Sequence, residues 1–236
     1  MPLQPIRFFY DLLNQSSRAL YIFLESSKIP FEAVSISVLK GEHLTGEYRD
    51  KVTRFKKVPA LTDHNLQLSE SVAMFRHLIR ENIIPEHWYP RKNFGRSRID
   101  EFLEWRQRNL GLASTDYFQQ KWLVPYLQKR QPNESAVNVA EKQLNHTLNE
   151  FEQLFLHSKG FMIGDNISYA DLLAICEIDQ PKYIGFNPFI HRPKLDRWYK
   201  TVRDELGTYY KEVTHEFDNK LRTAEKSHKE AISLKQ

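Results

Sequence analysis

A short polar cluster lies near the start of the chain, where an apolar segment meets a helical pattern. Asn14 and Ser17 supply an amide and a hydroxyl inside the stretch YDLLNQSSRALYIF. The aromatic run PIRFFY before this cluster predicts a strand, and the apolar spacing after it predicts a helix. The free amides and the dipole at the amino end of a helix attract negative charge. The junction therefore predicts an anion site, in which a polar side chain contacts the anion.

A second polar pair opens a later helical pattern. Glu70 and Ser71 lie in the stretch LSESVAMF, directly before apolar residues at helical spacing. The hydroxyl and amide of Ser71 could hold a carboxylate, while Glu70 could pair with an ammonium group. Together they match the zwitterionic head of an amino acid. The alternative is that both residues only cap the helix and complement its dipole.

A valine–proline pair precedes a short strand in the stretch KKVPAL. If the bond between Val58 and Pro59 is cis, the amide and carbonyl of Val58 turn outward, ready to pair with an extended peptide. The alternative is an ordinary proline at the start of a strand. The sequence leaves both possibilities open.

The elements that carry these residues predict an α/β half followed by an all-α half. Strand patterns in PIRFFY, FEAVSISVL, VPALTD and LQL alternate with helical patterns over 17–27 and 72–80, and 39–54 is expected to be loop with a short helix. The predicted order is β-α-β-α-β-β-α. After Asn82 every strong pattern is helical, so we expect domains at 1–82 and 96–236 joined by a linker at 83–95. In the second half, Ser168 and Asp171 have the spacing of a capping box at the start of a buried helix.

Composition narrows the classes of function. The chain has 236 residues, 41% of them hydrophobic, and a net charge of +4 spread without any basic block, which argues against nucleic-acid binding. No apolar run has the length of a membrane span, and the first residues do not have the pattern of a signal peptide. Cys176 is the single cysteine, so an intrachain disulfide is impossible. We expect a cytoplasmic protein without a metal site, in which Cys176 is a core residue.

The motifs together resemble those of cytosolic glutathione S-transferases. The resemblance is strongest to the theta class, insect members especially, and it rests on DLLNQSSRALYIF, KGEHL, KKVPAL, LSESVA, HWYPR, DEFLEW and NISYADLLA. It implies a thioredoxin-like domain that binds glutathione and a helical domain that completes a hydrophobic pocket. It also implies a cytoplasmic homodimer whose partners are glutathione and small hydrophobic electrophiles.

The resemblance also implies roles for individual residues. Glu70 and Ser71 would hold the γ-glutamyl head of glutathione, and Val58 would pair with the cysteinyl backbone across cis-Pro59. His43 and Lys57 would approach the glycine carboxylate, with Gln15 close by. Residues of the hydrophobic pocket would be Tyr10, Leu13, Arg108, Tyr117, Phe118 and Trp122. Arg108 is included because Gly111 stands where theta enzymes often have an arginine.

The chemistry of this family is attack by the glutathione thiolate on an electrophile, and hydroperoxide reduction uses the same thiolate. Theta enzymes stabilise it with a serine hydroxyl, and Asn14 occupies that position here. The amide NH2 of Asn14 can donate as a hydroxyl does. Alternatively Ser16 or Ser17 takes over, although Ser17 is also a candidate helix N-cap.

Two other classes of function stay open. The first is a protein that binds glutathione or a hydrophobic ligand without turnover, and the second is a docking module. An intact γ-glutamyl site argues against the docking module.

Overall fold

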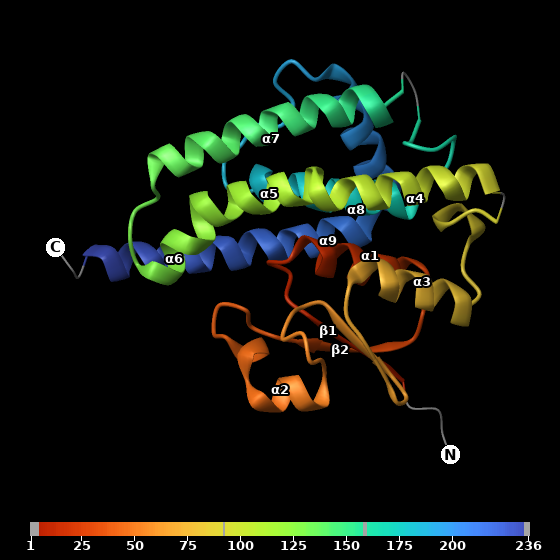
Figure 1. The fold of residues 1–236 in the computed structure, drawn as a ribbon, viewed down its shortest axis with the longest axis horizontal. Coiled ribbons are helices and arrows are strands. Elements are labelled where there is room, and N and C mark those ends of the chain that lie inside the picture. The colour runs from red at the N-terminus through yellow and green to blue at the C-terminus, as the bar shows by residue number, and fades with distance from the viewer. Residues whose placement is uncertain (1–4, 92, 158–159, 234–236) are drawn as a thin grey trace. The chain divides into compact units, whose positions relative to one another are not determined.

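The computed structural model describes residues 5–91, 93–157 and 160–233, and the chain divides into two compact units between Pro85 and Glu86. This division falls inside the stretch expected to be a linker. Each unit has its own core. Figure 1 shows strands and short helices in the first unit and helices in the second.

The first unit is built on a four-stranded sheet. Its strands are β1 (Ile6–Tyr10), β2 (Phe31–Ser35), β3 (Ala60–Asp63) and β4 (Leu66–Leu68), in the spatial order β2-β1-β3-β4. β2 runs parallel to β1, while β3 is antiparallel to both β1 and β4. Helices α1 (Gln15–Ser26), α2 (Gly46–Lys51) and α3 (Ser71–Glu81) complete the unit, with the 3-10 turn η1 (Glu42–Leu44) before α2. The predicted element order is confirmed.

Aromatic side chains fix the three layers of this unit. α1 and α3 cover one face of the sheet (Figure 1). They contact each other through Phe23 and Phe75, whose ring centroids are 5.1 Å apart. α2 lies on the other face, where Tyr48 packs edge-on against Phe9 at 6.2 Å. The alternation of side chains along a strand explains the arrangement, because Phe8 and Phe9 point to opposite faces and both are buried.

The second unit is all-helical, as predicted. After the 3-10 turn η2 (Glu86–Trp88) come α4 (Asn93–Arg108), α5 (Leu110–Phe118), the π-turn η3 (Gln119–Leu123), α6 (Val124–Gln128), α7 (Glu134–Phe155), α8 (Tyr169–Lys182) and α9 (Pro193–Ser233). α8 is the central helix, since every residue from Tyr169 to Pro181 is buried. Cys176 lies within it, fully buried, as expected.

A capping box begins α8. Asp171 accepts hydrogen bonds from the amide of Ser168 at 3.0 Å and from its hydroxyl at 2.7 Å. The same carboxylate accepts from the amide of Met162 and the indole of Trp198, both at 2.8 Å. The predicted cap is therefore confirmed, and it also ties α8 to α9 through Trp198.

Candidate functional site

Four chain segments converge at one end of the sheet. β1 and β2 are parallel, and both end there, with Tyr10 paired to Ser35. β3 is antiparallel to β1 and begins there, with Ala60 opposite Phe9. β4 is antiparallel to β3 and therefore also ends there. The segments at this end carry the residues predicted to bind glutathione, which are Asn14, Gln15, His43, Lys57, Val58, Pro59, Glu70 and Ser71.

Asn14 is the N-cap of α1. Its backbone is extended, and its Oδ1 accepts from the amide of Ser17 at 2.9 Å. The bond fixes which end of the carboxamide faces the helix, because only the oxygen can accept. In the described part of the chain the structure records no partner for the Asn14 NH2 group. That group is consequently available as a donor beside the helix amino end.

Ser17 lies inside α1 and is not its cap, so the prediction of an N-cap at Ser17 is wrong. The helix begins at Gln15, two residues earlier than the apolar spacing indicated, because the Asn14 carboxamide satisfies an amide of the first turn. Ser17 is fully buried, and its hydroxyl has no hydrogen-bond partner among the described residues. Ser16 is partly exposed in the same turn.

Arg18 is a residue of this junction that the sequence analysis missed. Its guanidinium is fully buried and donates from Nη1 to the carbonyl of Leu12 at 2.7 Å. It therefore braces the loop that carries Asn14, one helical turn away. The buried positive charge of Arg18, one helical turn from Asn14, also stabilises an anion bound nearby. The signal in the sequence was an arginine on the apolar face of a helix.

Asp11 connects this loop to the segment after β2. The fully buried carboxylate accepts from the amide of Leu13 at 3.1 Å and from the amide of Val38 at 2.9 Å. It also influences His43, farther along that segment. Burial lowers the pKa of His43 below its usual value, and the negative charge of Asp11 opposes part of this effect. His43 is thus neutral at pH 7, and its Nδ1 is buried without a hydrogen-bond partner in the described residues.

Glu70 and Ser71 start α3, as the pattern predicted. Glu70 is exposed and has a left-handed backbone (φ 69°), and its side chain makes no capping bond. The alternative that its carboxylate caps the helix is therefore wrong. Strained backbone of this kind at a residue other than glycine is characteristic of functional sites. Ser71 is the first helical residue and is 7% exposed.

The bond between Val58 and Pro59 is cis. Neither the amide nor the carbonyl of Val58 is hydrogen-bonded in the described part of the chain, so both resemble the free groups of a strand edge. Lys57 is exposed just before this pair. The cis alternative raised by the sequence is confirmed.

The residues predicted for the hydrophobic pocket are divided between the two units. Tyr10 and Leu13 belong to the first, where the ring of Tyr10 packs 5.0 Å from Tyr21 in an aromatic cluster. Tyr117, Phe118 and Trp122 belong to the second and are buried there. Phe118 contacts Trp122 at 5.1 Å, and Tyr117 contacts Phe186 at 5.3 Å. These aromatic rings therefore pack against other rings of their own unit, whatever contact they make with a ligand.

The structure explains the glycine at position 111. A Cβ there would lie 2.9 Å from Oε1 of Glu177 and 3.3 Å from Nη1 of Arg106. Glu177 and Arg106 form a buried ion pair. Gly111 thus leaves room for the side chain of Arg106, from α4. Arg108, which the sequence suggested as the substitute, is exposed at the end of α4.

Among the residues that the structure describes, no group of three or more His, Cys, Asp or Glu side chains is placed to hold a metal ion. Nor does any helix in the same residues have the length and apolar character needed to cross a membrane.

Comparison with known proteins shows the family of this chain. Residues 9–80 match the family model "Glutathione S-transferase, N-terminal domain", and residues 115–205 match "Glutathione S-transferase, C-terminal domain". Human glutathione S-transferase theta-1 is 37% identical over 213 residues, covering 89% of this chain and 88% of the relative. Mouse glutathione S-transferase theta-3 is also 37% identical, covering 89% and 87%.

Solved structures give the same result. The apo form of human glutathione S-transferase T1-1 superposes with a TM-score of 0.87 and 33% identity, covering 97% of this chain and 96% of that one. A human theta-class enzyme in complex with the glutathione conjugate of 1-menaphthyl sulfate gives 0.88 and 29%, covering 97% and 92%.

The fold is therefore a thioredoxin-like domain followed by an all-helical domain. The chain belongs to the glutathione S-transferase family, and its similar relatives are enzymes of the theta class.

Proposed function

We propose that this protein conjugates the thiolate sulfur of glutathione to hydrophobic electrophiles. The single observation that carries the proposal is the orientation of Asn14, whose oxygen caps α1 and whose NH2 group has no recorded partner in the described residues. In the reaction, the thiol proton passes to solvent and the sulfur forms a bond to the electrophilic carbon. The bond to the leaving group breaks, and that group departs with the electron pair.

The tripeptide would be held along its whole length. Glu70 accepts from the γ-glutamyl ammonium group, and Ser71 donates to the adjacent carboxylate. The free amide and carbonyl of Val58, next to cis-Pro59, pair with the cysteinyl backbone. At the glycine end, the carboxylate is bound by His43 and Lys57, with Gln15 close by.

The donor at Asn14 has enough strength for its role. A free thiol has a pKa of about 8.5, so only a few per cent is thiolate at neutral pH. A hydrogen bond to a charged acceptor contributes about 1.5–3 kcal/mol, which corresponds to about one to two pKa units. Asn14 acts as the donor, and the buried Arg18 adds long-range attraction. Ser17 is the weaker candidate because its hydroxyl is fully buried.

By the family resemblance, the residues that would contact the electrophile are Tyr10 and Leu13 in the first unit and Arg108, Tyr117, Phe118 and Trp122 in the second. The same thiolate would reduce hydroperoxides. Its sulfur attacks the peroxide oxygen and releases an alcohol, and a second glutathione then converts the sulfenic acid to a disulfide and water.

Three finer assignments belong to the same proposal. We propose a homodimer, supported by exposed apolar side chains in both units, and a cytoplasmic location, supported by the single, buried cysteine. We also place the chain near insect members of the theta class, on the likeness of its motifs.

The test uses two variants of Asn14 that both keep a helix cap. Asn14→Ser retains a donor, whereas Asn14→Asp keeps the accepting oxygen, loses the donor and adds a negative charge. The thiolate absorbance of bound glutathione is measured against pH. We expect Asn14→Asp to raise the thiol pKa by at least about one unit and to lower turnover about tenfold at pH 6.5, with Asn14→Ser close to the wild type.

Other outcomes separate the alternatives. Full activity in both Asn14→Asp and Ser17→Ala would show that neither residue is the donor. Glutathione binding without any thiolate absorbance in the wild type would indicate a non-catalytic binder. No retention on immobilised glutathione and no thermal shift with free glutathione would point to a docking module.

A further inference from the structure

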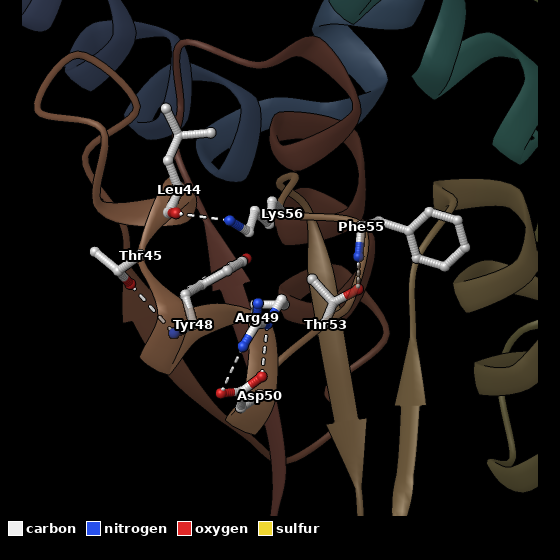
Figure 2. A network of polar contacts seen from close by, with 8 residues as sticks. All are labelled: Leu44, Thr45, Tyr48, Arg49, Asp50, Thr53, Phe55 and Lys56. Carbon is white, nitrogen blue, oxygen red and sulfur yellow. Dashed lines mark hydrogen bonds and ion pairs between the residues drawn. The ribbon is translucent and has the colours of Figure 1, made fainter.

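The loop between α2 and β3 is attached to three other parts of the first unit. The hydroxyl of Thr53 is 2.6 Å from that of Ser69, which precedes α3. The Lys56 ammonium donates to the carbonyl of Leu44 at 3.1 Å, in the turn η1 (Figure 2). The Tyr48 hydroxyl, on α2, donates to the carbonyl of Lys57 at 2.9 Å. The loop 53–57 thus links segments that are far apart in the sequence.

Each attachment lies next to a residue proposed to bind glutathione. Ser69 directly precedes Glu70, and Leu44 directly follows His43. The third attachment holds the backbone of Lys57 itself, one residue before Val58. A displacement of loop 53–57 would consequently move both ends of the tripeptide site.

The loop has a fixed shape of its own. Thr53 is 3% exposed, and it accepts from the amide of Phe55 at 3.2 Å through its hydroxyl and from the amide of Lys56 at 3.2 Å through its carbonyl. The backbone of Lys56 is left-handed, with φ 52°. In Figure 2 the Lys56 side chain extends toward Leu44, while the ring of Phe55 points away from the network.

The base of the loop is packed into a hydrophobic core cluster. Tyr48 is 4% exposed and packs with Phe9, Val52 and Ala60. Burial raises the pKa of Tyr48, so its hydroxyl stays a neutral donor to the Lys57 carbonyl. The amide of Tyr48 donates to the Thr45 hydroxyl that caps α2, at 3.2 Å (Figure 2).

We propose that Lys56 and Thr53 are positioning residues for glutathione. Lys56 places the glycine end by holding the turn that carries His43. Thr53 places the γ-glutamyl end by holding Ser69 beside Glu70. The inference rests on the proposed function, because it assumes that these residues contact the tripeptide.

The test compares glutathione with γ-glutamylcysteine, which lacks the glycine carboxylate. We expect Lys56→Met to raise the KM for glutathione by up to about tenfold with little change in kcat, because the turn that carries His43 loses its attachment to loop 53–57 and one charge-assisted hydrogen bond limits the loss to about this size. The KM for γ-glutamylcysteine should not change. Lys51→Met is the matched control, because in the described residues the ammonium of Lys51 pairs only with Glu47, on the exposed face of α2. It removes one positive charge and should leave both KM values unchanged.

Ionic strength separates positioning from simple attraction. If Lys56 acts through the turn, the loss in Lys56→Met persists at high salt. A loss that disappears at high salt, or that Lys51→Met reproduces, would overturn the role of Lys56. Equal losses with both substrates would also overturn it.

Thr53 has its own test. Thr53→Val, which removes the hydroxyl at nearly constant shape, should raise the KM for both substrates equally, and Thr53→Ser should restore the wild-type values. If Thr53→Val fails to fold, Ser69→Ala removes the same bond from the other side. Unchanged KM values in a folded variant would overturn the role of Thr53.

Failure of this inference can be told apart from failure of the proposed function. Calorimetry on the wild type with glutathione tests the function alone, and absence of binding there would refute the function itself. Binding by the wild type, together with unchanged KM values in both variants, would refute only the positioning roles.

Discussion

At the scale of single residues, Asn14 has two separate functional groups and uses them differently. Its oxygen accepts from the amide of Ser17, and its NH2 group, which has no recorded partner in the described residues, is the group that we propose contacts the thiolate. A serine at this position would need one hydroxyl for both tasks. The sequence left Asn14, Ser16 and Ser17 as candidate donors, and the burial of Ser17 is what favours Asn14.

The neutral state of His43 leads to a prediction about pH. Because burial lowers the pKa of His43, a carboxylate placed beside it should raise that pKa, and binding should take up a proton. We expect S-methylglutathione, which has no ionisable thiol, to bind at least about threefold tighter at pH 6 than at pH 8. Calorimetry at several pH values measures the affinity for S-methylglutathione.

His43→Asn is the control for that experiment, since asparagine keeps polarity without a titrating group. Its affinity for S-methylglutathione should be almost independent of pH. An equally strong pH dependence in His43→Asn would show that another group takes up the proton.

At the scale of elements, the start of α8 is fixed by one carboxylate. Asp171 accepts hydrogen bonds from Ser168, Met162 and Trp198, and so joins the helix start to the loop before it and to α9. Burial raises the pKa of Asp171, while these donors oppose the rise. A helix that is buried on all sides depends on such a cap because no water reaches its first amides.

Removing the Ser168 hydroxyl should therefore weaken the fold. We expect Ser168→Ala to lower the free energy of unfolding by about 1 kcal/mol, the usual value of a helix N-cap. Urea denaturation measures the change. Ser227→Ala on the exposed face of α9 is the control and should stay within about 0.5 kcal/mol of the wild type. Equal stability of Ser168→Ala and the wild type would refute the role of the cap.

At the scale of the whole molecule, exposed apolar side chains support the proposed homodimer. In the first unit Phe55 is 47% exposed and Leu66, on the edge strand β4, is 41% exposed. In the second unit Phe94 is 75% and Leu154 is 59% exposed. Exposed apolar side chains of this size are candidates for burial when two copies of the chain associate.

Sedimentation velocity tests the assembly. We expect a species of twice 28.1 kDa at micromolar concentration. Phe55→Ser should shift the equilibrium toward monomer while the chain stays folded, and its unfolding temperature should fall only as far as the lost association explains. A monomer at all concentrations for the wild type would contradict the homodimer.

The sequence determined the order of the elements, and the reason is local. Alternation in VPALTD, helical spacing after Ser71 and the cap at Ser168 each depend on residues a few positions apart, and the structure confirms them. The start of α1 was placed two residues late because apolar spacing marks the buried face and not the capped end. The site residues were indicated mainly by motif resemblance, and their roles stay predictions.

Only the tertiary structure decided how distant residues act together. The buried Arg18 brace, the pair of Arg106 with Glu177 beside Gly111, and the attachments of loop 53–57 join positions with no spacing rule between them. In the first unit, the register of the sheet brings the segment after β1, which carries Arg18, and the segment before β3, which contains loop 53–57, to one end of the sheet. That register follows from the packing of both faces. Local sequence therefore specifies which helices and strands form, whereas long-range packing decides which side chains meet.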